Sequence, residues 1–337
     1  MDKLKKLLSV FILGILLIGV LAGCGQKSQA DVVKSLGKKM ESLTSYHTKA
    51  SMTFKNGKVT KEYQAEIWYQ KPDYYKVMLN DGKKENTQMI IKNDEGVFVL
   101  TPAQNKKYHF QSEWPNNRSQ YYLFQSLVND IKKDANAKFQ SKNNDYYFTT
   151  KTNYETKLLS QQKITLNKKD LTPKNVKVMD QDSNVMIDIT FSSFNLNPNF
   201  EKGTFDVDKN MTTAKLDAKT SATPHPFTIM KPTQTIKGAK LSYSNEMKNA
   251  QGEQQFIIKY TGNKGYTIIE TQSQVSPTSE AVETTAQPVD LDANIGIMTN
   301  NSLAWSKGGM DFYLVSDKLS TDEMQEVAKS VSGQVTK

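Results

Sequence analysis

The chain has 337 residues, 37% of them hydrophobic, and a formal net charge of +9, so it is long enough for two domains with their own cores. Nearly all cationic residues are lysines, with Arg118 the single arginine. The bidentate forks that favour phosphate and base-edge recognition are therefore missing, and we expect no nucleic-acid partner. Cys24 is the only cysteine, which excludes a disulfide within the chain and leaves stability to packed cores.

The N-terminus has the pattern of a secretory signal. Three early lysines precede an apolar run from Leu7 to Val20, which is shorter than the roughly twenty residues of a spanning helix. The run ends at Leu21-Ala22-Gly23-Cys24, which resembles the lipobox of bacterial lipoproteins. The resemblance implies that residues 1–23 are removed by cleavage between Gly23 and Cys24, and that Cys24 carries diacylglyceryl and N-acyl chains. Residues 24–30 are then a lipidated tether at the outer face of the cytoplasmic membrane of a Gram-positive bacterium.

Residues 31–210 are expected to form the first domain. Apolar residues at helical spacing from Val32 to Leu43 predict a short amphipathic helix that Asp31 can cap. Period-two alternation follows from Tyr46 to Lys55, and Asn56-Gly57 is typical of a hairpin turn. Further strands are predicted at 63–69, 75–79, 87–92, 97–100 and 107–110, before a helical stripe within 119–131.

A second set of short strands is predicted at 146–150, 154–159, 163–166, 176–179 and 185–191. These strands and those before them predict one long antiparallel sheet, accompanied by only the two helices named above. Such a sheet can bury its apolar face by curling around the helices. The predicted fold class is therefore mainly β, with an α+β plan, and its interior is a core or a cavity.

Thr, Lys, Ala and Ser together make up most of residues 211–226, with two prolines and no periodic apolar face, which predicts a linker. A small C-terminal α+β domain, residues 227–337, follows with strands at 239–244, 255–260, 266–271, 295–299, 303–306 and 310–316. The polar segment 273–288 is predicted as a mobile loop. Ser320 and Glu323 form a capping box for a final helix that ends near Gly333.

The sequence predicts no catalytic site, no metal site and no cofactor. The three histidines are not at metal-ligand spacing, and there is no second cysteine. The nucleophile elbow, the P-loop and the dinucleotide fingerprint are absent. Two Ser-x-x-Lys matches, at 35–38 and 160–163, are expected by chance in a chain rich in both residues. We therefore expect a protein that is not an enzyme.

Aromatic residues are concentrated in the first domain, between Tyr46 and Phe124. One interpretation is the plain core of a β-rich fold. The other is that some of them line a concave apolar pocket for an acyl chain or for an apolar segment of a partner. The distribution of aromatic residues favours a plain core, but it does not exclude a pocket.

Two short motifs in the first domain indicate a family. Leu43-Thr44-Ser45-Tyr46-His47-Thr48, and the run from Ala65 to Lys76, resemble a helix end and a strand-to-strand corner of LolA-type lipoprotein carriers. The resemblance implies a half-open antiparallel β-barrel covered by helices, with an apolar cavity for acyl chains. The cavity positions here are Met52, Phe54, Ile67, Tyr69, Tyr75 and Val77. At the lid corner, Lys71 precedes Pro72 where the carriers have an arginine, so release and handover of a lipoprotein are not implied.

The C-terminal domain carries Ala304-Trp305, Gly308-Gly309 and the run Phe312 to Ser316, which resemble an uncharacterised domain of Gram-positive lipoproteins. Both domains together resemble the YdcC type of sporulation-linked Bacillus lipoprotein, and the plan is similar to RseB-type envelope sensors. Two functions are implied. The first is non-catalytic binding of a lipid or a lipoprotein acyl chain in the N-terminal cavity; the second is a regulatory sensor that binds a membrane-protein partner.

Overall fold

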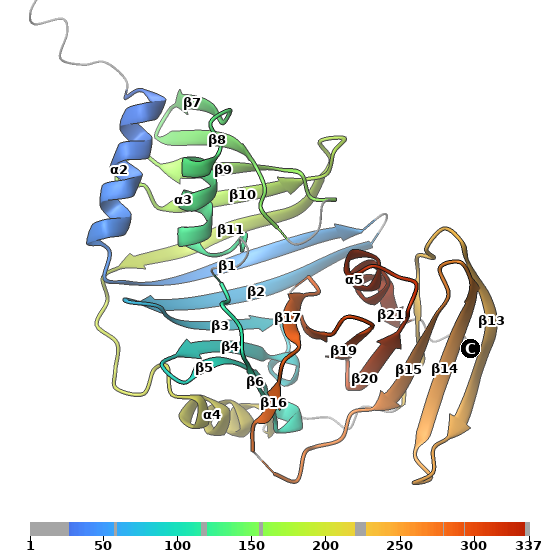
Figure 1. Ribbon diagram of the computed structural model, residues 1–337. Coiled ribbons are helices and arrows are strands. Elements are labelled where there is room, and N and C mark those ends of the chain that lie inside the picture. The colour runs from blue at the N-terminus through green and yellow to red at the C-terminus, as the bar shows by residue number, and fades with distance from the viewer. Residues whose placement is uncertain are drawn as a thin grey trace, which may run out of the picture.

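The computed structural model describes residues 27–56, 59–115, 120–154, 158–219, 227–278, 280–292 and 294–333. Its first domain is a curved twelve-stranded sheet with the order β16-β6-β5-β4-β3-β2-β1-β11-β10-β9-β8-β7 (Figure 1). The strands are β1 (Ser45–Asn56), β2 (Val59–Gln70), β3 (Tyr74–Asn80), β4 (Gln88–Asn93), β5 (Gly96–Thr101), β6 (Lys106–Phe110), β7 (Lys138–Lys142), β8 (Asp145–Lys151), β9 (Gln161–Asn167), β10 (Pro173–Met179), β11 (Val185–Leu196) and β16 (Val282–Thr284). Two 3₁₀ turns, η2 (Lys84–Asn86) and η3 (Pro102–Gln104), connect β3–β4 and β5–β6.

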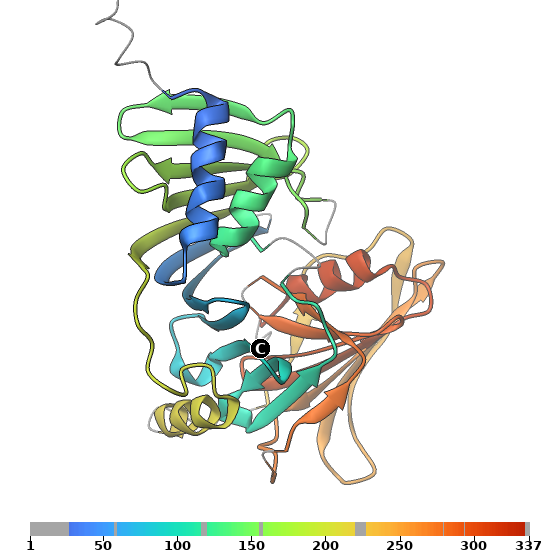
Figure 2. The same cartoon turned by 60° about the vertical axis from the view of Figure 1, so that its left-hand side comes forward.

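Two helices cover one face of this sheet, α2 (Gln29–Ser42) and α3 (Phe124–Lys133). Figure 2 shows them side by side in front of strands β7 to β11. The N-cap of α2 is Ser28, whose hydroxyl accepts the Asp31 N–H, while the Asp31 carboxylate accepts the Ser28 N–H, so the predicted cap Asp31 is the second half of a capping box. The amphipathic pattern buries Val32 and Leu36 against the sheet, as predicted.

The second domain is a seven-stranded sheet with the order β13-β14-β15-β20-β19-β18-β17 and a C-terminal helix, α5 (Thr321–Ser330). Its strands are β13 (Ala239–Lys248), β14 (Gln254–Gly262), β15 (Tyr266–Gln272), β17 (Gln287–Asp290), β18 (Ile295–Met298), β19 (Ser302–Lys307) and β20 (Met310–Val315). A small two-stranded sheet pairs β12 (Met230–Pro232) with β21 (Val331–Gly333). The predicted capping box of Ser320 and Glu323 is confirmed, but α5 ends at Ser330 and Gly333 lies in β21, not at the helix end.

The predicted linker is wrong in its first half, because residues Val207–Lys219 form the helix α4. Val207 and Met211 are buried against a satellite cluster on β4 and β5, with Ala214 packed beside them. These three residues lie at i, i+4 and i+7 and so form one face of a helix. Because the predicted linker begins at Met211, it excludes Val207, and the helical spacing is not recognised. Residues 220–226 lie outside the described residues.

Two further segments differ from their predicted form. Residues 273–288 are not a single loop, because β16 joins the first domain's sheet in parallel with β6 and β17 joins the second sheet. The predicted strand at 154–159 is absent where the segment is described. Tyr154 lies in a loop instead, where its side chain is half-buried against the core and its hydroxyl donates to the Gln162 side chain (2.5 Å).

Candidate functional site

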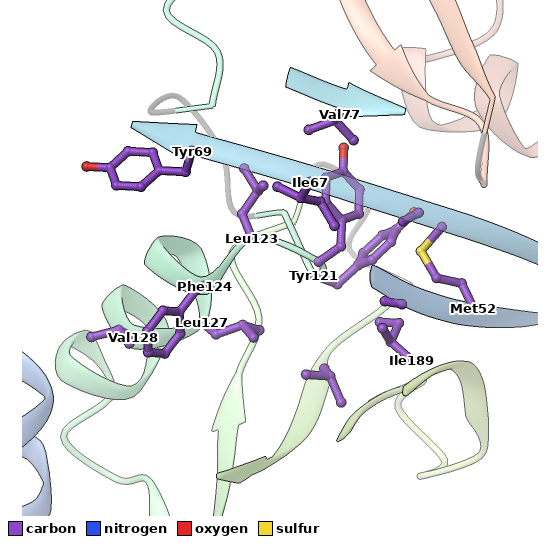
Figure 3. Packing of buried hydrophobic residues seen from close by; sticks show 14 of the residues in the cluster. Met52, Ile67, Tyr69, Val77, Tyr121, Leu123, Phe124, Leu127, Val128 and Ile189 are labelled. Atoms are coloured by element: carbon purple, nitrogen blue, oxygen red, sulfur yellow. The ribbon is translucent and has the colours of Figure 1, made fainter. Parts of the chain in front are cut away.

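The six predicted cavity positions lie together on the inner face of the first sheet, and there they are packed. Met52, Ile67 and Val77 are at most 1% exposed, and Tyr69 is 6% exposed. Figure 3 shows Leu123 and Tyr121, from the segment that leads into α3, next to Ile67 of β2. These positions form the core expected of a β-rich fold, and α3 and the segment before it pack in front of them. Of the six, Phe54 alone borders any of the cavities described below.

The predicted lid corner joins α2 to the turn between β2 and β3. The Lys71 ammonium group donates to the carbonyl of Glu41 in the last turn of α2, and the Lys71 N–H donates to the Thr44 carbonyl (2.8 Å). A cation near a helix C-terminus is favourable because the last carbonyls carry partial negative charge. Lys71 therefore holds the covering helix α2 to the sheet corner.

A groove lies between the two sheets, and cross-strand register explains its apolar wall. Trp305 and Phe312 lie on one face of the second sheet. On its other face, residues that are cross-strand partners form one row from β18 to β14. The row consists of Ile297, Ala304, Tyr313, Ile269 and Ile257. All are half-buried except Tyr313, which is 46% exposed. Because side chains alternate across a strand, this row is continuous, and the described residues place no helix over it.

The opposite wall of the groove comes from β5 and β6 of the first sheet. Val99 and Tyr108, which pair across these strands, face the row over a cavity of about 340 Å³. The cavity ends at an ion pair between Lys106 and Asp311 (2.5 Å), whose carboxylate also accepts the Ser306 hydroxyl (2.6 Å). Four residues of the row, all but Ile257, line this cavity, together with the polar side chains of Gln88, Thr101, Gln255 and Thr271. The groove thus combines an apolar row with polar groups and one ion pair.

A second cavity of about 310 Å³ adjoins the groove at Trp305 and Ser306 and has a more polar lining. Lys307 lines it and donates to the Val331 carbonyl (2.6 Å). Burial, together with the neighbouring Lys61 ammonium, lowers the pKa of Lys307 to about 7. A third cavity, of about 320 Å³, lies between the first sheet and α5 and includes Phe54.

Other kinds of site are not visible among the described residues. They contain no group of three or more His, Cys, Asp or Glu side chains that could hold a metal, and no helix long and apolar enough to cross a membrane. Gly23 and Cys24 lie outside the described part of the chain, so their lipidation stays a prediction.

The groove was missed at the sequence level, although one signal for it was present. In these strands one face is already apolar, through Phe256, Ile258 and Ile268. Ile257 and Ile269 lie between or beside these residues and therefore point to the other face, where polar side chains are expected. Such continuous runs indicate strands with both faces covered. Which other surface covers the second face depends on how the two domains pack, and a strand pattern does not contain that information.

The fold defines a mainly β protein in which an open, helix-covered sheet is followed by a second sheet domain. The chain belongs to the family described as Sporulation protein YdcC-like, which matches residues 4–205. Over 339 residues it is 43% identical to Sporulation protein YdcC of Bacillus subtilis (strain 168), with both chains covered in full.

Solved structures with similar folds are more distant. MucB in the Pseudomonas aeruginosa MucA/MucB complex is 10% identical, with 91% of this chain and 99% of that chain covered, at a TM-score of 0.33. A LolA superfamily protein from Nitrosomonas europaea is 12% identical, with 52% and 98% covered, at a TM-score of 0.30. Likeness at this level does not assign a ligand or a partner to the present chain.

Proposed function

We propose that this protein is a lipid-anchored, non-enzymatic binding protein at the outer face of the cytoplasmic membrane, and that it acts in sporulation by holding an apolar ligand such as a lipid or lipoprotein acyl chain. The site we assign is the groove between the sheets rather than the packed interior of the first domain. The observation that carries this choice is that Ile297, Ala304, Tyr313 and Ile269 of the apolar row line, together with Val99 and Tyr108, a cavity of about 340 Å³.

The dimensions and the chemistry of the groove support this proposal. Ligand sites typically have volumes of about 300–1,000 Å³, a mainly apolar lining and a few polar groups that fix orientation. The Lys106–Asp311 pair supplies such a polar end. An acyl chain along the row removes Tyr313 and its half-buried neighbours from water, at roughly 25 cal/mol per Å² of apolar surface.

The test is binding of a fluorescent fatty acid, together with mass spectrometry of lipids that remain on protein gently extracted from its own membrane. A carboxylate in the groove must be desolvated beside the acyl chain, so Tyr313→Glu is expected to weaken binding at least about ten-fold. Leu216→Glu is the matched control, because Leu216 is 63% exposed on α4, and binding is expected to stay within about two-fold. Equal binding by Tyr313→Glu and wild type contradicts the assigned groove. A stoichiometric membrane protein in place of lipid supports the regulatory function instead.

The anchor has its own test. Cys24→Ser removes the only thiol that can accept diacylglycerol, so radiolabelled palmitate is expected to be lost. The mutant protein is expected in the soluble fraction or with its signal retained. Undiminished lipid labelling of this variant refutes the anchor and leaves the groove assignment untouched.

A further inference from the structure

The edge strand β13 presents an open surface. It has ten residues, it pairs with β14 on one side, and no strand among the described residues pairs with its other side. Leu241, Tyr243 and Met247 are 58%, 42% and 44% exposed. A long edge strand with exposed apolar side chains is a template for another strand, and proteins usually cover such edges.

The pairing with β14 assigns the two faces of β13. A register shift between Leu241 and Tyr243 marks a bulge, and beyond it Tyr243 lies opposite Lys259 and Met247 opposite Gln255. Asn245, between them, lies opposite Ile257, so these three residues share the face that carries the apolar row of the groove. Leu241 lies on the other face, opposite Tyr260.

The backbone of β13 shows which groups point outward. The N–H of Glu246 donates to the Asn245 side-chain oxygen (3.0 Å), so this donor is not engaged with β14. By the alternation of an antiparallel ladder, Ser244 and Glu246 then direct their N–H and C=O groups to the open edge, while Asn245 directs its own towards β14.

We propose that β13 pairs with β13 of a second copy of this chain, in an antiparallel arrangement centred on Asn245. The Glu246 N–H then exchanges its bond to the Asn245 side chain for one to the Ser244 carbonyl of the second copy, and its own carbonyl accepts the Ser244 N–H of that copy. The two Asn245 residues form a non-hydrogen-bonded pair on the two-fold axis. The pairing continues the seven-stranded sheet across the axis.

This register is favoured because it covers every large apolar side chain that β13 exposes. Tyr243 meets Met247 of the second copy, twice by symmetry, and sulfur–aromatic contacts of this kind are favourable. Past the bulge, Leu241 meets the aliphatic stem of Lys248. No like charges lie directly opposite each other. A two-fold axis perpendicular to the sheet also places both grooves on the same face of the joined sheet.

The first test uses the full chain with Cys24→Ser, so that an added cysteine is the only thiol. Asn245→Cys places two thiols across a non-hydrogen-bonded pair, where Cα atoms are about 4.5 Å apart and a disulfide fits. We expect most of the protein to crosslink as a dimer under mild oxidation. Ser244→Cys is the control: it lies opposite Glu246 rather than itself, and less than about a tenth is expected to crosslink.

The second test is a charge exchange measured by sedimentation equilibrium. Tyr243→Lys with Met247→Lys places lysines opposite each other twice and is expected to weaken dimerisation at least ten-fold. Tyr243→Lys with Met247→Glu creates two opposite-charge pairs and is expected to restore it. Three results overturn the proposal: a monomeric wild-type chain at about 100 µM, equal crosslinking at 244 and 245, or no difference between the two double variants.

Discussion

At the scale of single residues, neighbouring tyrosines in the segment before α3 have opposite environments. The Tyr121 hydroxyl donates to Asp290 of β17 (2.5 Å), which ties the two domains together. The Tyr122 hydroxyl is buried and has no hydrogen-bond partner among the described residues. Both side chains are at most 6% exposed, so their packing contributions are similar and the hydroxyl groups make the difference.

Tyr121→Phe is expected to lower the free energy of unfolding by about 1–3 kcal/mol, because a buried hydrogen bond to a carboxylate is lost. Tyr122→Phe removes a hydroxyl without a partner and is expected to be neutral within about 0.5 kcal/mol, or stabilising. Urea denaturation of the two variants makes the comparison. Equal losses in both refute the role of the Tyr121–Asp290 bond.

Glu270 is a carboxylate in the apolar core of the second domain. It is fully buried, Phe256 and Phe312 are its cross-strand neighbours, and the Met230 N–H donates to both of its oxygens (3.0 and 3.2 Å). Burial raises the pKa of Glu270 from 4.5 to about 7. The folded protein therefore holds a proton that the unfolded chain has released between these two pH values.

Stability is expected to fall as pH rises from about 4.5 to about 7, by up to about 3 kcal/mol, because the folded state binds the extra proton in this window. Below pH 4.5 both states are protonated, and above pH 7 both are ionised, so the dependence levels off. Glu270→Gln is expected to flatten the profile measured by urea denaturation at each pH. Glu246→Gln, on exposed β13, is expected to keep the wild-type slope, and a slope that persists in Glu270→Gln assigns it to another group.

At the scale of elements, α4 adds a second layer to the first sheet. Met89, Ile91, Phe98 and Leu100 of β4 and β5 face α4, while the alternate residues of the same strands face the main core. The unbroken apolar runs Met89-Ile90-Ile91 and Val97 to Leu100 follow from this covering on both sides. The helix therefore belongs to the first domain and does not act as a free linker.

Met211→Ala is expected to lower the free energy of unfolding by about 2–4 kcal/mol, because Met211 is 2% exposed in the contact between α4 and the sheet. Leu216→Ala, in the same helix, changes a side chain that is 63% exposed and is expected to cost no more than about 0.5 kcal/mol. Chemical denaturation measures both. A loss below about 0.5 kcal/mol in Met211→Ala indicates that α4 is not part of the cooperative unit.

At the scale of the whole molecule, the two domains are joined by shared structure rather than by a tether. β16, from the C-terminal half, extends the first sheet beside β6 (Figure 1), and the Ile295 N–H donates to the Gln88 side chain (2.7 Å). These contacts hold the two sheets at a fixed separation. The groove assigned to an apolar ligand depends on that separation, because each of its walls belongs to a different domain.

The sequence by itself determined the local features of this protein. Alternation predicted nearly all the strands of the first sheet, Asn56-Gly57 predicted the hairpin between β1 and β2, and Ser320 with Glu323 predicted the start of α5. These features depend on neighbours a few residues apart, so propensity, capping and period are sufficient. The mainly β fold and the family resemblance followed from the same local patterns.

Only the tertiary structure decided whether the apolar face is a core or a cavity, and where an open groove lies. Ile67 is equally apolar in both cases, and the packing of Leu123 and Tyr121 against it settles the question. In the same way, Ile269 and Val99 are distant in sequence and line one cavity only because the domains dock. Packing between surfaces depends on long-range geometry, and the period of a single strand does not encode it.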